Sequence, residues 1–179
     1  MLRVIGGEFK RRKLEQPSLD TTRPTKDIAK EGLFNSLGDI LGLSFLDCFG
    51  GSGAMGIEAR SRGAKDVTII EQDKKAYEII CKNVSNLGIE DIKVIREDFF
   101  IAIKRLRKQF DLIFIDPPYK LIIDEEFINK LYDLNLVGKD TKIIIERDTD
   151  LPDQLFKDFK IKELKYGRSY LYILEKEEL

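Results

Sequence analysis

LDCFGGSGAMG, residues 46–56 of this 179-residue chain, is the stretch that decides the fold. A short apolar strand, about Ser44–Cys48, runs into it, and a helical pattern, about Ala54–Arg62, leaves it. Its glycines match G-x-G-x-x-G, a spacing that lets a ligand approach the backbone closely. Glu71 ends the next strand twenty residues after Gly51, where a carboxylate can accept hydrogen bonds from ribose hydroxyls. Strand, glycine loop, helix and acidic strand end together predict a nucleotide-type ligand site.

The rest of the chain continues the alternation of strand and helix. Further strands are expected at about Val67–Glu71, Ile92–Ile95, Leu112–Ile115 and Lys142–Glu146. Further helices are expected at about Lys74–Leu87, Phe100–Lys108 and Glu125–Leu134. Crossover helices between short apolar strands predict a parallel sheet covered on both faces. A terminal hairpin, about Phe159–Tyr166 and Tyr170–Glu175, adds one antiparallel strand.

The first thirty residues form a small appendage to this α/β domain. Leu2–Ile5, a Gly-Gly turn and a second extended piece predict a β-hairpin. Thr25 is expected to cap a helix. The predicted apolar stripe of this helix consists of Ile28, Leu33, Phe34, Leu37, Ile40 and Leu41. We therefore expect one domain over 1–179, divided into a basic extension (1–30) and a ligand-binding catalytic core (31–179).

Composition excludes several kinds of chemistry. The chain has no histidine, which removes Ser-His-Asp and Cys-His catalysis and most zinc and non-haem iron sites. Its two cysteines, Cys48 and Cys81, give neither a disulfide framework nor a CxxC pair, so no metal is expected. No apolar run approaches the roughly 20 residues that span a bilayer, and the N-terminus lacks a signal-peptide pattern. A cytoplasmic protein is expected.

The glycine loop fits either NAD or S-adenosylmethionine, and three details favour the second. Asp47 ends the first strand, where a carboxylate opposes a pyrophosphate but suits an ammonium group. The glycines start later than in a dinucleotide fingerprint, and Asp98 can accept from an adenine amino group, with Phe99 against the ring. The plain alternative is a tight glycine turn. The candidate cofactor residues are Asp47, Phe49, Gly50, Gly51, Ser52, Gly53, Glu71, Gln72, Asp98 and Phe99.

A buried strand that runs into Asp116-Pro117-Pro118-Tyr119 predicts the catalytic site. The two prolines fix φ and remove two backbone donors, which leaves a rigid turn rich in acceptors. The Asp116 carboxylate and the Pro117 carbonyl can both accept N–H bonds from an aryl amine, and Tyr119 offers a flat face to the base. A base in a structured nucleic acid must be extruded to reach such a pocket. A rigid turn that only ends a core strand is the alternative.

With these motifs the chain resembles the class I methyltransferases that carry Asp/Asn-Pro-Pro-Tyr/Phe, a group with a seven-stranded Rossmann-like sheet in which one strand is reversed. It includes adenine-N6, cytosine-N4, guanine-N2 and protein-glutamine methyltransferases. The following segments are similar to the bacterial 16S rRNA guanine-N2 methyltransferases of the RsmD family: Arg3-Val4-Ile5-Gly6-Gly7, Arg23-Pro24-Thr25, residues 31–37, residues 50–59 and Tyr166-Gly167-Arg168-Ser169.

This resemblance implies methylation of the guanine conventionally numbered 966 in small-subunit rRNA, within a partly or fully assembled 30S subunit. It also gives a role to the first thirty residues, whose formal charge is +4 against −5 for the rest. The candidate RNA-binding residues are Arg3, Lys10, Arg11, Arg12, Lys13, Arg23 and Thr25, with the basic side chains on phosphates. An ordinary solvated hairpin would carry the same charges.

Three other functions remain open at this point. An adenine-N6 methyltransferase would use the same cofactor and motif on RNA or DNA. An NAD-dependent oxidoreductase would need a proton donor and a substrate domain, and neither is visible. A catalytically inactive RNA-binding module would not need an intact Asp116-Pro117-Pro118-Tyr119.

Overall fold

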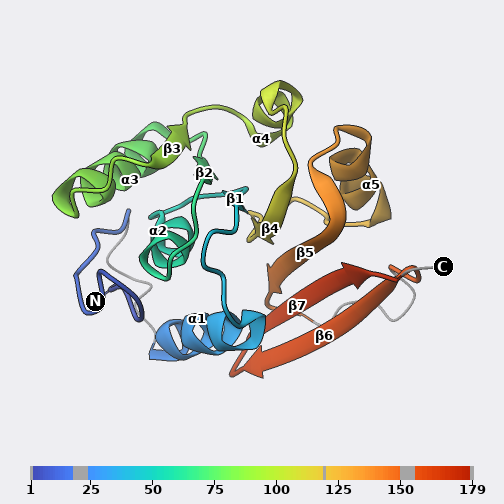
Figure 1. The fold of residues 1–179 in the computed structure, drawn as a ribbon, viewed down its shortest axis with the longest axis horizontal. Helices are drawn as coiled ribbons and strands as arrows, with labels where there is room; N and C mark the ends of the chain where they lie inside the picture. Colours follow the sequence, from blue (N-terminus) through green and yellow to red (C-terminus); the bar gives the residue numbers. More distant parts are fainter. Residues whose placement is uncertain (1, 18–23, 119, 150–155, 178–179) are drawn as a thin grey trace.

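A computed structural model describes residues 2–17, 24–118, 120–149 and 156–177 (Figure 1). Five α-helices and a short 3-10 helix are described in these residues: α1 (Pro24–Leu37), α2 (Ala54–Ser61), α3 (Lys74–Asn86), α4 (Phe99–Ala102), the 3-10 turn Ile103–Arg105 and α5 (Glu125–Asp133). The strands are β1 (Phe45–Asp47), β2 (Val67–Ile70), β3 (Ile92–Ile95), β4 (Phe110–Ile115), β5 (Val137–Arg147), β6 (Phe159–Tyr166) and β7 (Ser169–Lys176).

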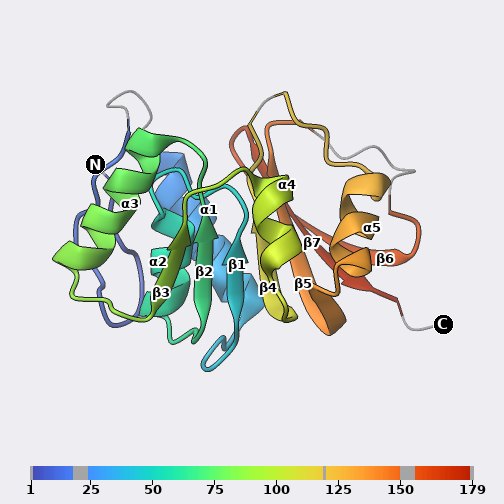
Figure 2. The same ribbon diagram turned by 90° about the horizontal axis from the view of Figure 1, so that it is seen from above.

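The seven strands form one sheet in the order β3-β2-β1-β4-β5-β7-β6. Strands β1 to β5 pair in parallel, and β7 runs antiparallel to both β5 and β6. One strand is therefore reversed, as the sequence predicted. Figure 2 shows helices in front of the sheet and behind it. One hydrophobic cluster takes residues from α1, α2 and α3, and a second takes residues from α4 and α5.

The central strands are buried on both faces, which explains their unbroken apolar sequences. All three residues of β1 are buried, as are all four of β2 and five of the six of β4. In β4, Phe114 belongs to the cluster on the α1 side, whereas Ile113 and Ile115 belong to the opposite cluster. Alternate residues of a strand thus point to opposite faces, and this alternation decides which side chains reach the site.

Two elements of the core differ from the sequence prediction by more than two residues at one end. The helix predicted at Phe100–Lys108 is shorter: α4 covers Phe99–Ala102 and a 3-10 turn follows. Leu106 leaves the turn with an extended ψ of 133° and buries its side chain, because the chain must reach the start of β4 at Phe110. Strand β5 is longer than the predicted Lys142–Glu146, since Val137 also pairs with Phe110 across a register shift.

The prediction that Thr25 caps the first helix was wrong. Helix α1 begins at Pro24, so Thr25 lies within its first turn. Proline is favoured at the first helical position because the missing N–H has no partner there in any case. The predicted apolar stripe was also partly wrong: Ile28 is 57% exposed and Leu41 is 70% exposed, while Leu33 and Phe34 are buried. Arg23 lies outside the described residues.

The N-terminal segment, residues 2–17, folds back on itself as a hairpin and packs on the core. An antiparallel bridge joins Arg3 to Lys13, and Leu14 N donates to the Leu2 carbonyl at 2.9 Å. Val4 and Leu14 are buried within the cluster on the α1 side. The extension therefore completes the core of the domain. No helix in the described part of the chain is long and apolar enough to cross a membrane.

Candidate active site

The candidate site lies where the chain leaves the carboxyl ends of β1 and β4. These two strands are neighbours in the sheet. The chain goes from β1 to β2 on one side and from β4 to β5 on the other, and such a reversal of direction leaves a crevice between the two strand ends. Asp47 is the last residue of β1, and Asp116 directly follows β4. Their backbones are joined by a hydrogen bond from Cys48 N to the Phe114 carbonyl at 3.0 Å. The topology thus brings together the two carboxylates that the sequence assigned to cofactor and catalysis.

The glycine loop takes a conformation that side chains would obstruct. A Cβ added at Gly50 would lie 2.5 Å from Cγ2 of Ile69, so the loop lies directly against β2. Gly53, the N-cap of α2, has a φ of 77°, in the left-handed region that favours glycine. The loop is also tethered by Glu71, whose carboxylate accepts from Gly51 N and from Asp73 N, each at 2.8 Å. Glu71 therefore shapes the loop and the start of α3 together.

Asp47 is the most unusual charged group of the site. It is 1% exposed, and its Oδ1 has no hydrogen-bond partner among the described residues. Burial raises its pKa to about 7; backbone hydrogen bonds from Phe49 and Gly56 lower it, and the nearby Glu71 raises it further. A buried carboxylate with an unpaired oxygen is costly unless a ligand supplies a donor. A cationic group such as an ammonium supplies both the donor and the charge.

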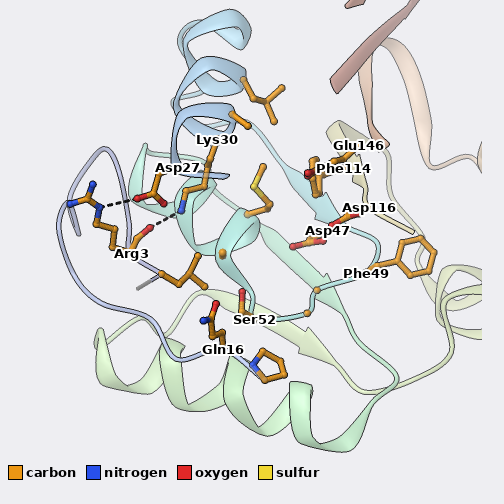
Figure 3. Close-up of a pocket in the computed structure, with 18 of the residues that line it drawn as sticks. Arg3, Gln16, Asp27, Lys30, Asp47, Phe49, Ser52, Phe114, Asp116 and Glu146 are labelled. Atoms are coloured by element: carbon orange, nitrogen blue, oxygen red, sulfur yellow. Dashed lines mark hydrogen bonds and ion pairs between the residues drawn. The ribbon is translucent and has the colours of Figure 1, made fainter. Parts of the chain in front are cut away.

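A cavity of about 610 Å³ opens over these residues and is closed on one side by the N-terminal segment. The predicted site residues in its wall are Arg3, Arg11, Lys13, Asp47, Phe49, Gly50, Gly51, Ser52 and Asp116. Figure 3 shows Asp47 and Asp116 on one side of this cavity, with Arg3 and Lys30 across from them. One cavity therefore holds residues predicted for cofactor binding, catalysis and RNA contact.

The other predicted cofactor residues do not line the cavity. Gly53 caps α2, Gln72 is exposed beside Glu71, and the Asp98 carboxylate accepts from Ile101 N at 3.2 Å as the cap of α4. Phe99 is 3% exposed; its ring centroid lies 5.0 Å from that of Phe49 and 5.2 Å from that of Phe127. Phe49 therefore contacts both the cavity and Phe99, the residue predicted to lie against the adenine ring.

The turn that follows β4 is exposed. Asp116 and Pro118 are exposed and Pro117 is half-buried. The Pro118 carbonyl accepts from Leu121 N at 2.8 Å, which closes a turn beyond the motif. Tyr119 lies outside the described residues. Of the basic residues, Lys10 and Arg12 are exposed on the hairpin but do not line the cavity.

A buried acid on α2 fixes the N-terminal segment beside the cavity. Glu58 is fully buried and accepts from Ile5 N at 2.8 Å and Gly6 N at 2.7 Å. It also pairs with Arg62 at 2.7 Å and with Lys30 at 3.3 Å. Lys30 in turn donates to the Arg3 carbonyl at 2.7 Å, and burial lowers the pKa of this lysine. These bonds hold Arg3 at the edge of the cavity.

A second contact joins the N-terminal segment to the glycine loop. The Asn83 side chain, 2% exposed on α3, donates to the carbonyls of Ser52 at 3.0 Å and Glu15 at 2.9 Å. Its Oδ1 accepts from Glu15 N at 2.8 Å. Because one amide holds both segments, Gln16 comes to line the cavity beside Ser52 (Figure 3).

Sequence reasoning missed Lys30, Glu58, Asn83 and Glu146 as site residues. Glu146 ends the run Ile143–Glu146 and lines the cavity beside Asp116. The rule that singled out Asp47 and Glu71, a carboxylate at the carboxyl end of a parallel strand, applies equally to Glu146 and could have found it. Lys30, Glu58 and Asn83 carry no such signal, because charged or amide residues on helices are most often exposed.

Three comparisons bear on this architecture. The family model described as conserved hypothetical protein 95 matches residues 2–175. The chain is 34% identical over 150 residues to Ribosomal RNA small subunit methyltransferase D of Escherichia coli strain K12, covering 83% of this chain and 76% of that protein. The solved structure of yhhF from Escherichia coli superposes with a TM-score of 0.86 at 32% identity and 99% coverage of both chains.

A more distant structure shares the fold alone. It is the Thermus thermophilus 16S rRNA N2 methyltransferase RsmC in complex with AdoMet and guanosine. Its TM-score is 0.73 at 21% identity, covering 90% of this chain and 45% of that one.

The fold and the cavity define a Rossmann-like methyltransferase of the class that uses S-adenosylmethionine. The chain belongs to the conserved hypothetical protein 95 family, the RsmD family of the sequence resemblance. In the described residues no group of three or more cysteine, aspartate or glutamate side chains could hold a metal ion.

Proposed function

We propose that this protein transfers a methyl group from S-adenosylmethionine to the exocyclic N2 amine of a guanine in 16S rRNA. One observation carries the proposal: Asp47 and Asp116 line the same cavity, at the ends of neighbouring strands. The first suits the cationic end of the cofactor and the second suits the amine that receives the methyl group. The relatives named for small-subunit rRNA methylation support the choice of substrate.

The residues present fit the cofactor. The buried Asp47 with its unpaired Oδ1 would hold the ammonium group of the methionine part. Gly50, Gly51 and Ser52 would lie against the cofactor, while Glu71, Asp98 and Phe99 remain the candidates for its ribose and adenine. When bound, S-adenosylmethionine supplies a methyl group on a sulfonium sulfur. A pyrophosphate in the same place would face the Asp47 carboxylate, which argues against a dinucleotide.

The protein contributes position and electrostatics to the reaction. The lone pair of an aryl amine is delocalised into the base, so the amine is a poor nucleophile. The Asp116 carboxylate and the Pro117 carbonyl would accept its N–H groups and so orient the lone pair toward the cavity. Tyr119 remains a predicted stacking face for the base. A guanine paired in rRNA would first be extruded into the cavity.

Basic residues around the cavity would hold the RNA. Arg3, Arg11 and Lys13 lie in the cavity wall, and Lys10 and Arg12 are exposed on the same hairpin. Contacts from these side chains to phosphates would position the substrate without reading its sequence. We propose 16S rRNA in a partly or fully assembled 30S subunit as the partner, in the cytoplasm. Arg23 and Thr25 stay in the predicted RNA-binding set.

Two measurements test this function together. Isothermal titration should show binding of S-adenosylmethionine and none of NAD. Transfer of tritiated methyl to 30S particles lacking the modification should fall by about 10³-fold or more in Asp116→Ala, because a group that orients the reacting atom is lost. The variant should keep its affinity for cofactor and RNA. NAD binding, or full transfer by the variant, would contradict the proposal.

A further inference from the structure

Glu146 is a second carboxylate at the substrate end of the cavity. It lies near the end of β5, is half-buried, and lines the cavity together with Asp116 (Figure 3). Neither the glycine loop nor the Asp-Pro-Pro-Tyr motif contains it, and the chemistry proposed above does not use it. The Glu146 carboxylate lies next to the residue that would hold the amine.

The sheet register places Glu146 beside Asp116. Ile115 of β4 is the partner of Ile145 of β5, so the next residues, Asp116 just after β4 and Glu146 within β5, lie at the same level. Adjacent strands lie about 4.8 Å apart. Alternation also sets the face: Ile144 belongs to the cluster on the α1 side, and Glu146, two residues on, points the same way. The carboxylate therefore reaches the cavity from the α1 side of the sheet.

A hydroxyl on the neighbouring strand holds the Glu146 side chain in place. Ser169, the first residue of β7, donates its Oγ proton to Glu146 Oε1 at 2.9 Å. Leu171 of β7 is the strand partner of Glu146 and also lines the cavity. A carboxylate has about four acceptor positions on its two oxygens, so one carboxylate can accept several hydrogen bonds at once. Glu146 is thus an oriented acceptor at the substrate end.

We propose that Glu146 selects guanine by accepting a hydrogen bond from its ring N1–H while Asp116 holds the adjacent N2 amine. This inference rests on the proposed function. In guanine the ring nitrogen next to the amine carries a proton, so two acceptors side by side match two donors side by side. In adenine and cytosine the ring nitrogen next to the amine carries a lone pair, which a carboxylate repels. Glu146 thereby favours guanine over the other amino bases.

The test changes both partners of the proposed hydrogen bond: the N1–H donor of the base and the Glu146 acceptor of the protein. Small subunits are reconstituted with 16S rRNA that carries guanine or 2-aminopurine at the methylated position. 2-Aminopurine keeps the 2-amine, but its N1 is an acceptor. Wild-type protein should methylate guanine far faster. In Glu146→Gln the amide oxygen can still accept from N1–H but without a charge, and the amide NH2 can donate to an unprotonated N1. The kcat/KM for guanine should therefore fall about 10-fold and that for 2-aminopurine should rise, with cofactor Kd unchanged.

Control variants separate recognition from structure. Glu163→Gln makes the same substitution at an exposed position of β6 and should leave both substrates unchanged. Ser169→Ala should shift the ratio of the two substrates in the same direction as Glu146→Gln, but less. An equal loss on both substrates, or an unchanged ratio, would overturn the role of Glu146 and leave guanine methylation intact. A wild-type protein that methylates adenine instead would overturn the proposed function and this inference together.

Discussion

Two buried carboxylates hold different parts of the molecule. Glu58 anchors the N-terminal segment to α2, and Asp47 lies at the start of the glycine loop; the two differ in what surrounds them. Glu58 accepts from two backbone amides, Arg62 and Lys30. Asp47 has an oxygen with no partner in the described part of the chain, and burial raises its pKa to about 7. A buried acid whose oxygens are all paired stabilises the fold. A buried acid with an unpaired oxygen is stabilised when a ligand donates to it. The comparison therefore predicts opposite effects of removing each charge.

The largest effect should be a loss of stability when Glu58, the acid that anchors the N-terminal segment, is removed. Glu58→Ala removes the acid that compensates Lys30 and Arg62 and leaves a buried lysine without its ion-pair partner. Loss of one partner of a buried pair costs about 3–5 kcal/mol, so the free energy of unfolding in urea should fall by that amount. Glu163→Ala, at an exposed position, is the matched control. A loss below about 1 kcal/mol would mean that the anchor does not stabilise the domain.

Removing the charge of the glycine loop should instead affect binding. In Asp47→Asn the affinity for S-adenosylmethionine should fall about 100-fold, because a charge-assisted hydrogen bond to the ammonium is lost. Thermal stability without cofactor should be kept or raised, since a poorly compensated buried charge is gone. Isothermal titration and thermal unfolding measure the two quantities, with exposed Asp140→Asn as control. Unchanged affinity would remove Asp47 from the cofactor site.

The raised pKa of Asp47 predicts a pH dependence of smaller size. Between about pH 4 and pH 7 the folded protein keeps the Asp47 proton that the unfolded chain has already lost, so its contribution to stability declines as pH rises and is constant above pH 7. From pH 5 to pH 7, Asp47→Asn should therefore gain about 2 kcal/mol relative to the wild type. Denaturation curves at both pH values measure this. A stability difference that does not vary with pH would contradict it.

The smallest effect concerns the exposed face of the N-terminal segment. Replacement of Arg11 and Arg12 by alanine should weaken RNA binding and lower the slope of log K against log salt by about 1.5, since each phosphate contact contributes about 0.7–0.9. Stability should be unchanged, in contrast to the loss in Glu58→Ala. Arg105 and Arg107, exposed beyond the end of α4, provide the control pair. An unchanged salt slope would show that this hairpin does not contact phosphate.

The contrast between Asp47 and Glu58 also explains how far sequence reasoning reaches. That Asp47 and Asp116 line one cavity was predictable, because parallel strands bring their carboxyl ends to one edge of the sheet. Glu58 meets Ile5 and Gly6 across more than fifty residues, and Asn83 meets Glu15 across 68. Such pairings depend on how the hairpin packs on the core, and no local spacing encodes them.

Element boundaries failed for a related reason. Thr25 has the chemistry of a helix cap, but the preceding proline is itself well suited to the first helical position, so α1 starts at Pro24, two residues earlier than a cap at Thr25 would give. The helical pattern after Phe100 was overridden by burial of Leu106 in an extended conformation. In both places tertiary packing or a neighbouring residue outweighed local propensity.

We propose that guanine N2 is methylated in the cavity lined by Asp47 and Asp116. The most direct test is transfer of tritiated methyl onto small-subunit rRNA and partly assembled 30S particles from cells lacking this protein, followed by nucleoside analysis. We expect N2-methylguanosine at a single site. N6-methyladenosine, or no methylated nucleoside from a protein that binds S-adenosylmethionine, would contradict this proposal.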